Sequence, residues 1–339
     1  MNRTLIIAEA GVNHNGDLQM AKELIQVAAD SGADVVKFQT FNSEKLVSNE
    51  AQLADYQKKN MNNDISNQLE MLKKIELPKS WHFELKYYAE QLGISFCSTP
   101  FDEDALDFLC ELEIPFIKIP SGEITNKPFL ERIASKNLKV ILSTGMANMI
   151  EVEDAVNVLL DGGLRKDMLT VLHCNTEYPT PFEDVNLKAM LQFEKLGVHF
   201  GYSDHTVGSE AAIAAVALGA TVIEKHFTLD KNLPGPDHKA SLEPNELFEF
   251  IKSIRSTELI ISGSGKKETS PSEQKNIVIA RKSIHLKNNV NQGHLISLDD
   301  LEMKRPGSGI SPMDYEKVLN KKVKRDLLVG TLLKWEDFE

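Results

Sequence analysis

The chain has 339 residues, a formal net charge of −12 and a 42% share of hydrophobic residues. This length suits a barrel of about 250 residues followed by a small module. The acidic balance argues against nucleic-acid binding, which needs a basic surface, although a few lysines converging in a pocket can still bind a small anion. No apolar run approaches the roughly 20 residues that cross a bilayer, and the N-terminus has no signal-peptide pattern. The three cysteines lack metal-ligand spacing and indicate reduced thiols in the core. We therefore expect a cytoplasmic location and, because no spanning run is present, no membrane partner.

Eight short apolar runs recur along the chain, with amphipathic stretches between most of them. The runs cover residues 4–9, 34–40, 94–99, 116–121, 139–144, 169–174, 199–204 and 221–227. The stretches between them, such as LQMAKELIQVAADSG, have apolar residues at helical spacing. Apolar strands that alternate with helices indicate a parallel sheet, and eight such units predict an α/β fold of the (β/α)8 TIM-barrel type. A doubly wound open sheet is the alternative, but no G-x-G-x-x-G follows the first run.

Two regions depart from this alternation. Residues 43–78 are far longer than an ordinary connection and carry their own helical pattern, which is typical of a lid or a partner contact. Residues around 263–279 are polar and rich in serine and glycine, which indicates a linker. The sequence therefore predicts a catalytic barrel at 1–262, a linker at 263–279 and a small β-rich domain at 280–339.

Polar side chains occur at the ends of all eight predicted strands. In a barrel these ends meet at one face, where such enzymes have their active sites. The residues are Glu9, Lys37, Gln39, Ser98, Thr99, Lys118, Ser121, Glu123, Ser143, Thr144, His173, Asn175, Glu177, Tyr178, Asp204, His205, Glu224, Lys225 and His226. This crowding predicts a catalytic site and argues against a non-catalytic carbohydrate-binding protein.

Two histidines follow neighbouring strands, His205 after the seventh and His226 at the end of the eighth. Two neutral imidazoles leave positions on a metal ion open for water and substrate. Together with Asp204, Glu224 and Asp237 they favour a divalent metal site. The alternative is that His205 only pairs with Asp204 and that His226 is a hydrogen-bonded core residue.

Two lysines, Lys37 and Lys118, lie within apolar strands, where an ammonium group needs an anion. Together with nearby hydroxyl groups they can form a cradle for phosphate and carboxylate groups. The hydroxyl groups are those of Ser98, Thr99, Ser121, Ser143 and Thr144. Two alternatives stay open, namely structural ion pairs with Glu9 and Glu123, and Schiff-base chemistry at Lys118 as in lyases built on the same barrel.

Several motifs together resemble the bacterial sialic acid synthase family. They are IIAEAGVNHNGD, VVKFQT, FCSTPFDEDALDFL, KIPSGEITN, ILSTGMA, HCNTEYPTPFEDVNL, GYSDHT, IEKHFTLDKNLPGPDHKAS and MKRPGSGISP. The resemblance runs from about residue 4 to the C-terminus and implies that 280–339 form an antifreeze-like (SAF) domain. It also implies a metal-dependent synthase that condenses phosphoenolpyruvate with an N-acyl amino sugar and releases phosphate by C–O cleavage.

The same resemblance implies roles for individual residues. A divalent metal, most often Mn²⁺ with Mg²⁺ or Co²⁺ as alternatives, falls on His205 and His226. The implied catalytic residues are Glu9, Glu123, Lys37 and Lys118. The implied phosphoenolpyruvate-binding residues are Lys37, Gln39, Thr99, Lys118, Ser121, Ser143 and Asn175, with Thr176 as the alternative to Asn175. The implied sugar-binding residues are Tyr178, Asp237 and Arg305.

Arg305 matches an arginine that a neighbouring subunit inserts into the site, which implies a domain-exchanged homodimer. The first interpretation of the substrate is N-acetylmannosamine, which would give N-acetylneuraminate. The alternative is 2,4-diacetamido-2,4,6-trideoxymannose, which would give legionaminic acid. The motifs are shared by both kinds of synthase and do not separate the two sugars.

Overall fold

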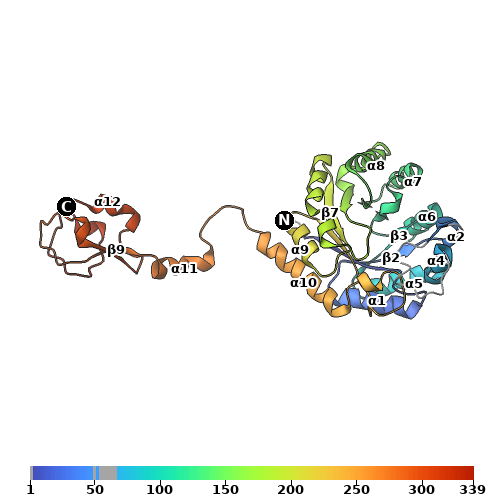
Figure 1. Cartoon of the computed structure of the whole chain (residues 1–339), viewed down its shortest axis with the longest axis horizontal. Helices are drawn as coiled ribbons and strands as arrows, with labels where there is room; N and C mark the ends of the chain where they lie inside the picture. The colour runs from blue at the N-terminus through green and yellow to red at the C-terminus, as the bar shows by residue number, and fades with distance from the viewer. Residues whose placement is uncertain (1–2, 49–50, 53–66) are drawn as a thin grey trace. The chain divides into compact units, whose positions relative to one another are not determined.

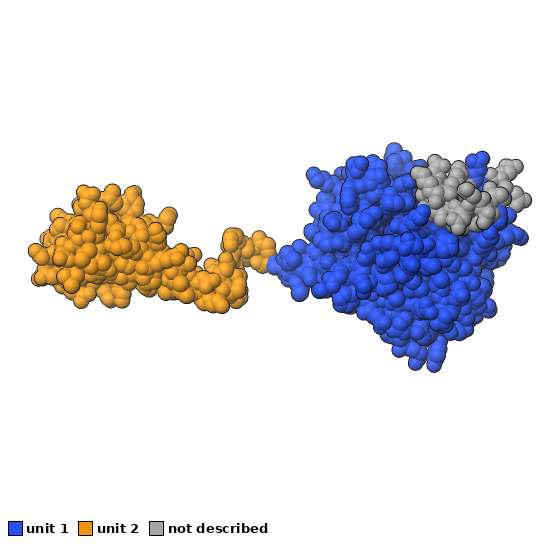
Figure 2. Space-filling model, turned by 60° about the horizontal axis from the view of Figure 1, so that its bottom comes forward, with its two compact units in different colours: residues 1–263 blue, residues 264–339 orange. Residues whose placement is uncertain are grey.

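The structure is a computed structural model that describes residues 3–48, 51–52 and 67–339. It divides into two compact units, Met1–Gly263 and Ser264–Glu339, which Figure 2 colours separately. Each unit has a hydrophobic core of its own. The stretch interpreted as a linker contains a helix, α11 (Pro271–Ala280), which begins at a capping box between Ser270 and Glu273.

The larger unit is built around eight parallel strands in the order β3-β2-β1-β8-β7-β6-β5-β4. The two strands at the ends of this order, β3 and β4, lie side by side, so the sheet closes into a barrel (Figure 1). The strands are β1 (Leu5–Gly11), β2 (Val35–Thr40), β3 (Ser95–Pro100), β4 (Ile117–Ile119), β5 (Val140–Ser143), β6 (Leu169–His173), β7 (His199–Asp204) and β8 (Val222–His226). The predicted TIM barrel is confirmed.

Helices surround the barrel and bury their apolar faces against it. They are α1 (Leu18–Asp30), α5 (Lys79–Gln91), α6 (Glu103–Glu111), α7 (Lys127–Ala134), α8 (Met149–Asp161), α9 (Glu210–Ala217) and α10 (Pro244–Ile261). Between β6 and β7 the chain instead forms a 3₁₀ helix, η4 (Leu187–Leu196), which starts and ends at residues with left-handed backbone conformation. In the described ranges, no helix has the length and apolarity needed to span a bilayer.

Part of the long connection between β2 and β3 forms two short helices, α2 (Ser43–Leu46) and α4 (Gln68–Ile75). Asn67 caps the N-terminus of α4, and its side chain accepts a hydrogen bond from the backbone N–H of Glu70. Its apolar side packs against Val12 in the loop after β1, so α4 lies at the end of the barrel where β1 terminates. Residues 49–50 and 53–66 of the predicted lid lie outside the described residues.

The smaller unit pairs β9 (Ser283–Leu286) with β10 (Leu301–Lys304) in antiparallel register and adds a short helix, α12 (Tyr315–Val318). Ile284, Leu286, Val318 and Leu333 are fully buried in its core. The apolar residues of this core come from the smaller unit alone, so its stability depends on contacts that the barrel does not supply.

We expect a core substitution in the smaller unit to destabilise that unit alone. Leu286→Ala removes a fully buried side chain and should lower the free energy of unfolding of this unit by about 2–5 kcal/mol. The chain has two tryptophans, Trp81 in the larger unit and Trp335 in the smaller one. In a Trp81→Phe background, tryptophan fluorescence therefore reports on the smaller unit, whereas far-UV circular dichroism is dominated by the barrel. The denaturant concentration at the fluorescence midpoint should fall, and that at the circular-dichroism midpoint should not change. An equal decrease of both midpoints would contradict the independence of the two cores.

Candidate active site

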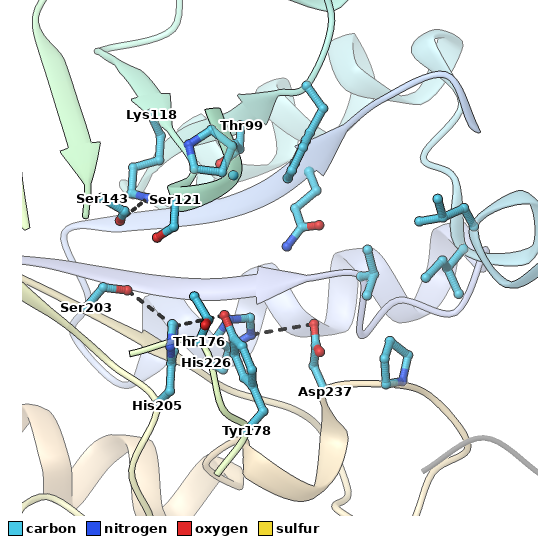
Figure 3. Close-up of a pocket in the computed structure, with 18 of the residues that line it drawn as sticks. Thr99, Lys118, Ser121, Ser143, Thr176, Tyr178, Ser203, His205, His226 and Asp237 are labelled. Carbon is cyan, nitrogen blue, oxygen red and sulfur yellow. Dashed lines mark hydrogen bonds and ion pairs between the residues drawn. The ribbon is translucent and has the colours of Figure 1, made fainter. Parts of the chain in front are cut away.

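A cavity of about 550 Å³ opens where the strands of the barrel end. It is lined by residues in or just after all eight strands, so the predicted meeting of the strand ends is present. Figure 3 shows that the labelled polar residues form two groups. One group contains Thr99, Lys118, Ser121 and Ser143, and the other contains Thr176, Tyr178, Ser203, His205, His226 and Asp237.

A buried carboxylate, Glu224, is shared by the two strand lysines. Its Oε2 lies 3.6 Å from Nζ of Lys37, and its Oε1 lies 3.7 Å from Nζ of Lys118. Glu224 also accepts a hydrogen bond of 3.0 Å from the hydroxyl of Ser203. Lys37 has a second carboxylate partner, Glu9, at 2.5 Å. Of the alternative structural ion pairs, the one between Lys37 and Glu9 is therefore present, whereas Lys118 pairs with Glu224 and not with Glu123.

Hydroxyl groups complete this side of the cavity. Lys37 donates a hydrogen bond of 2.9 Å to Oγ1 of Thr99. Lys118 donates one of 2.7 Å to Oγ of Ser143 (Figure 3). Ser121 lines the same cavity, and its Oγ accepts from the backbone N–H of Gly145 at 3.0 Å. Two ammonium groups beside several hydroxyls can bind an anion with more than one negative charge.

The two glutamates around Lys37 have opposite pKa shifts. Burial favours the neutral form of both, but at Glu224 the attraction of Lys118 and Lys37 is stronger and holds its pKa at about 2. At Glu9 burial dominates, and together with repulsion from Glu224 it raises the pKa to about 7 despite Lys37. Near neutral pH, Glu224 is therefore ionised and Glu9 can exchange a proton.

The lysines also differ. Burial lowers the pKa of Lys118, and the charge of Glu224 only partly compensates. At Lys37, the carboxylates of Glu224 and Glu9 outweigh burial and raise the pKa. Lys37 thus stays charged over the whole physiological pH range.

Two imidazole rings, those of His205 and His226, lie on the opposite side of the cavity with centroids 5.6 Å apart. Burial lowers the pKa of His205 to about 4 and that of His226 well below its ordinary value, so both rings are neutral near pH 7. His205 Nδ1 is hydrogen-bonded to the carbonyl oxygen of Asn175, which places the ring proton on Nδ1 and leaves Nε2 as an acceptor. Nδ1 of His226 is buried and has no hydrogen-bond partner in the described part of the chain.

These neutral rings fit the requirements of a divalent cation, which binds imidazole only through an unprotonated nitrogen. Nowhere in the described ranges do three or more His, Cys, Asp or Glu side chains form a group that could hold a metal ion. Two imidazoles would therefore have to share the ion with water and substrate, as in an open catalytic site.

Two residues implied in sugar binding lie beside the imidazoles. The ring of Tyr178 stacks on His205 with centroids 4.1 Å apart, and its hydroxyl donates a hydrogen bond of 3.1 Å to Nε2. Oδ2 of Asp237 lies 4.0 Å from Nδ1 of His226, and burial raises the pKa of this carboxyl to about 6. Both residues line the cavity.

Lys225, between Glu224 and His226, faces away from the cavity. Its ammonium group lies 2.9 Å from Oδ2 of Asp204 and donates to the carbonyl oxygen of Thr206 at 2.5 Å. Asp204 in turn accepts from the backbone N–H and the hydroxyl of Thr206. The partner of Asp204 is therefore Lys225 and not His205, and this buried pair fixes the chain on both sides of His205.

Not all predicted site residues of the larger unit line the cavity. Glu9 lies behind Lys37 and Gln39, and its Oε1 accepts from Nε2 of Gln39 at 3.3 Å. Glu123 instead accepts a hydrogen bond of 2.6 Å from Asn126. Arg305 belongs to the smaller unit, where its Nε donates to the carbonyl oxygen of Ala280 at 2.9 Å.

The structure also separates the two candidates after β6. The side chain of Asn175 accepts from the backbone N–H of Glu177 at 2.7 Å, within its own turn, whereas Thr176 lines the cavity. Asn175 contributes to the site through its carbonyl oxygen, which orients His205. A residue that the sequence analysis undervalued is Glu224. Its spacing of two from His226 was the available signal, since residues i and i+2 of a strand face the same side.

Comparison with known proteins matches the NeuB family over residues 24–267 and the SAF domain over residues 281–339. The chain belongs to the NeuB family. It is 55% identical to the N,N'-diacetyllegionaminic acid synthase of Campylobacter jejuni, over 95% of this chain and 96% of that protein. It is 48% identical to the N,N'-diacetyllegionaminic acid synthase of Legionella pneumophila, over 98% of this chain and 94% of that protein.

A solved NeuB-like structure, the N-acetylneuraminic acid (sialic acid) synthetase of Leptospira borgpetersenii in complex with citrate, is also similar. It superposes with a TM-score of 0.72 at 37% identity, over 81% of this chain and 90% of that chain. The resemblance noted in the motifs is confirmed, and it extends over both the barrel and the SAF domain.

Proposed function

We propose that this chain is an N,N'-diacetyllegionaminic acid synthase. It would condense phosphoenolpyruvate, 2,4-diacetamido-2,4,6-trideoxymannose and water to N,N'-diacetyllegionaminic acid and phosphate. The choice of sugar is supported by identities of 55% and 48% to two synthases of this product, against 37% to a sialic acid synthetase. Our first interpretation, N-acetylneuraminate synthesis, is therefore the less well supported of the two.

The reaction class is supported by one arrangement in the cavity, a buried pair of lysines that faces a pair of neutral imidazoles. Lys37 and Lys118, with the hydroxyls of Thr99, Ser121 and Ser143, would bind the phosphate and carboxylate of phosphoenolpyruvate. These groups are held in place before the ligand binds, because Glu224 already orients both ammonium groups.

We further propose that His205 and His226 hold a divalent cation, most often Mn²⁺, with Mg²⁺ or Co²⁺ as alternatives. When bound, such an ion supplies Lewis-acid polarisation of the sugar's aldehyde. Thr176, Tyr178 and Asp237 would hold the sugar in the orientation for attack.

The bond changes follow from this placement. C3 of phosphoenolpyruvate forms a bond to the aldehyde carbon, and water adds to C2. The resulting tetrahedral centre loses phosphate as the C2–O bond breaks. One proton of the water ends on the sugar oxygen and the other on the phosphate. Lys37 and Lys118 stabilise the negative charge of the leaving phosphate.

Glu9 is the base in this proposal, because its pKa of about 7 allows it to accept a proton near neutral pH. A Cβ at Gly11 would lie 3.4 Å from Oε1 of Glu9, from Nε2 of Gln39 and from Cε1 of His226, so the Glu9 carboxyl lies close to two residues of the cavity lining. Glu123, whose carboxylate accepts a hydrogen bond from Asn126 and which likewise lies outside the cavity lining, is not assigned a step.

The assembly is a separate proposal. Arg305 would reach the sugar from the SAF domain of a partner subunit, in a domain-exchanged homodimer. Its support is the match of "KRPGSG" to the family's inserted arginine. The cytoplasmic location likewise stays a prediction.

The first test is phosphate release from phosphoenolpyruvate with each amino sugar. We expect turnover with 2,4-diacetamido-2,4,6-trideoxymannose at a kcat/KM well above that for N-acetylmannosamine, complete loss with EDTA and recovery with Mn²⁺. A Schiff-base lyase at Lys118 would instead resist EDTA and be trapped by borohydride in the presence of pyruvate. Turnover of N-acetylmannosamine alone would overturn the proposed substrate.

The second test concerns the base. Because ionised Glu9 must accept the proton, log kcat should fall by about one unit per pH unit below pH 7, where Glu9 becomes protonated. Glu9→Gln should lower kcat by about 10²–10⁴-fold, and the residual activity should no longer fall below pH 7. Asp237→Asn is the matched control, because Asp237 is a second carboxyl of the site with a raised pKa, of about 6. This variant should keep the fall in log kcat below pH 7. If log kcat of Glu9→Gln still falls below pH 7, the assignment of Glu9 as the base is refuted.

The third test concerns assembly. Arg305→Ala chains lack the inserted arginine, and His226→Ala chains lack a metal ligand, so each should be inactive alone. Mixed and allowed to exchange subunits, they should regain part of the wild-type activity, because one site in the mixed dimer is then complete. Absence of recovery in a sample shown to contain mixed dimers would count against the exchanged arrangement.

A further inference from the structure

One side of the active-site cavity is apolar, and neither the motifs nor the relatives' names assign it a role. It is formed by Val12, Met71, Leu72 and Ile75, which we call the apolar wall. All four are buried, with exposed fractions of 8% or less, and they form one hydrophobic cluster with Phe41. Among the described residues, this cluster is separate from the main barrel core.

The apolar wall lies at the outer end of the cavity. The reacting groups, on Lys37, Lys118 and His226, sit within strands of the barrel. Val12 instead follows the last residue of β1, and the other three wall residues lie on α4, in the connection between β2 and β3. A ligand whose reacting carbon meets the strand residues therefore places its far end against the apolar wall.

For an open-chain amino sugar, the reacting carbon is C1 and the far end is C6. In 2,4-diacetamido-2,4,6-trideoxymannose C6 is a methyl group, whereas in N-acetylmannosamine it carries a hydroxyl. The wall side chains have no hydrogen-bonding atoms apart from the weakly accepting sulfur of Met71. Burial of a methyl group against these side chains is favourable in free energy. Burial of a hydroxyl there is unfavourable, because its hydrogen bonds to water are not fully replaced.

Polar groups stand close to this wall. Gln68, at the start of α4, and Gln52 line the same cavity. Their amides can hydrogen-bond to acetamido groups, which have both a donor and an acceptor. The combination suits a sugar that is rich in acetamido groups and lacks a terminal hydroxyl.

We propose that the apolar wall of Val12, Met71, Leu72 and Ile75 binds the C6 methyl group of the sugar and thereby selects 6-deoxy over 6-hydroxy substrates. This inference rests on the proposed function and adds the part of the chain that sets its specificity. An apolar site discriminates against one added hydroxyl by about 10–100-fold.

The direct test uses two sugars that differ only at C6, 2,4-diacetamido-2,4,6-trideoxymannose and its 6-hydroxy counterpart, with phosphate release as the readout. Wild-type kcat/KM should favour the 6-deoxy sugar by about 10–100-fold. Because this comparison needs no variant, it does not depend on the folding of an altered chain.

Two variants then locate the discrimination. Val12→Thr conserves shape and adds one hydroxyl, and Leu72→Asn adds an amide of similar size at the least buried wall residue. Each variant should reduce the ratio of kcat/KM for the 6-deoxy sugar to kcat/KM for the 6-hydroxy sugar by about tenfold, chiefly because kcat/KM for the 6-hydroxy sugar rises. Val27→Thr on α1, outside the cavity lining, is the matched control and should leave the preference unchanged.

The outcomes separate this inference from the function on which it rests. If the wild type turns over both diacetamido sugars equally well, the selection by the apolar wall is refuted and the synthase proposal stands. Equal losses for both sugars in Val12→Thr and Leu72→Asn would refute it in the same way. If the wild type uses N-acetylmannosamine alone, the proposed function fails first, and the inference fails with it.

Discussion

The site depends on the carboxylate of Glu224, which lies between two ammonium groups inside the barrel. Lys37 and Lys118 are both buried, and two positive charges in an apolar interior repel each other and lose their hydration. Glu224 compensates for part of this cost, and its own ionised form is stabilised in return, as its pKa of about 2 reflects. In the proposed function, the phosphoenolpyruvate anion would neutralise the remaining positive charge of the group, which the partly protonated Glu9 reduces. The fold thus holds the two ammonium groups in a fixed geometry at the expense of local stability.

The alternation of side chains along β8 gives a single strand two functions. Glu224 and His226 face the cavity, while Lys225 faces the surrounding layer and pairs with Asp204 at the end of β7. That outer pair also holds the carbonyl and the N–H of Thr206, next to His205. The histidine that follows β7 is therefore oriented from both sides, by the Lys225–Asp204 pair and by the carbonyl oxygen of Asn175. Interactions outside the barrel in this way determine geometry inside it.

The sequence was informative where local pattern determines structure. Apolar runs at strand length predicted all eight strands, and the polar residues at their ends predicted which side chains converge, because closure of the barrel leaves little choice. Connections were harder. After β6, the side chain of Asn175 accepts from the backbone N–H of Glu177 and Thr176 lines the cavity, which the sequence did not predict. The capping box that starts α11 lies in a polar stretch that we interpreted as a linker. The position of α4 over the cavity depends on contacts with Val12 far away in the chain, and no local pattern records such contacts.

Helix α4 belongs to an insertion between β2 and β3, whereas the lysines, Glu224 and His226 belong to strands that are fixed by their neighbours on both sides. Residues of the insertion can therefore change without disturbing the register of the barrel. A lineage of such enzymes could acquire a new acceptor by altering one connecting segment, while the bond-forming apparatus is inherited intact. If the apolar wall selects the sugar as proposed, this segment and not the strand ends sets the product of such a synthase.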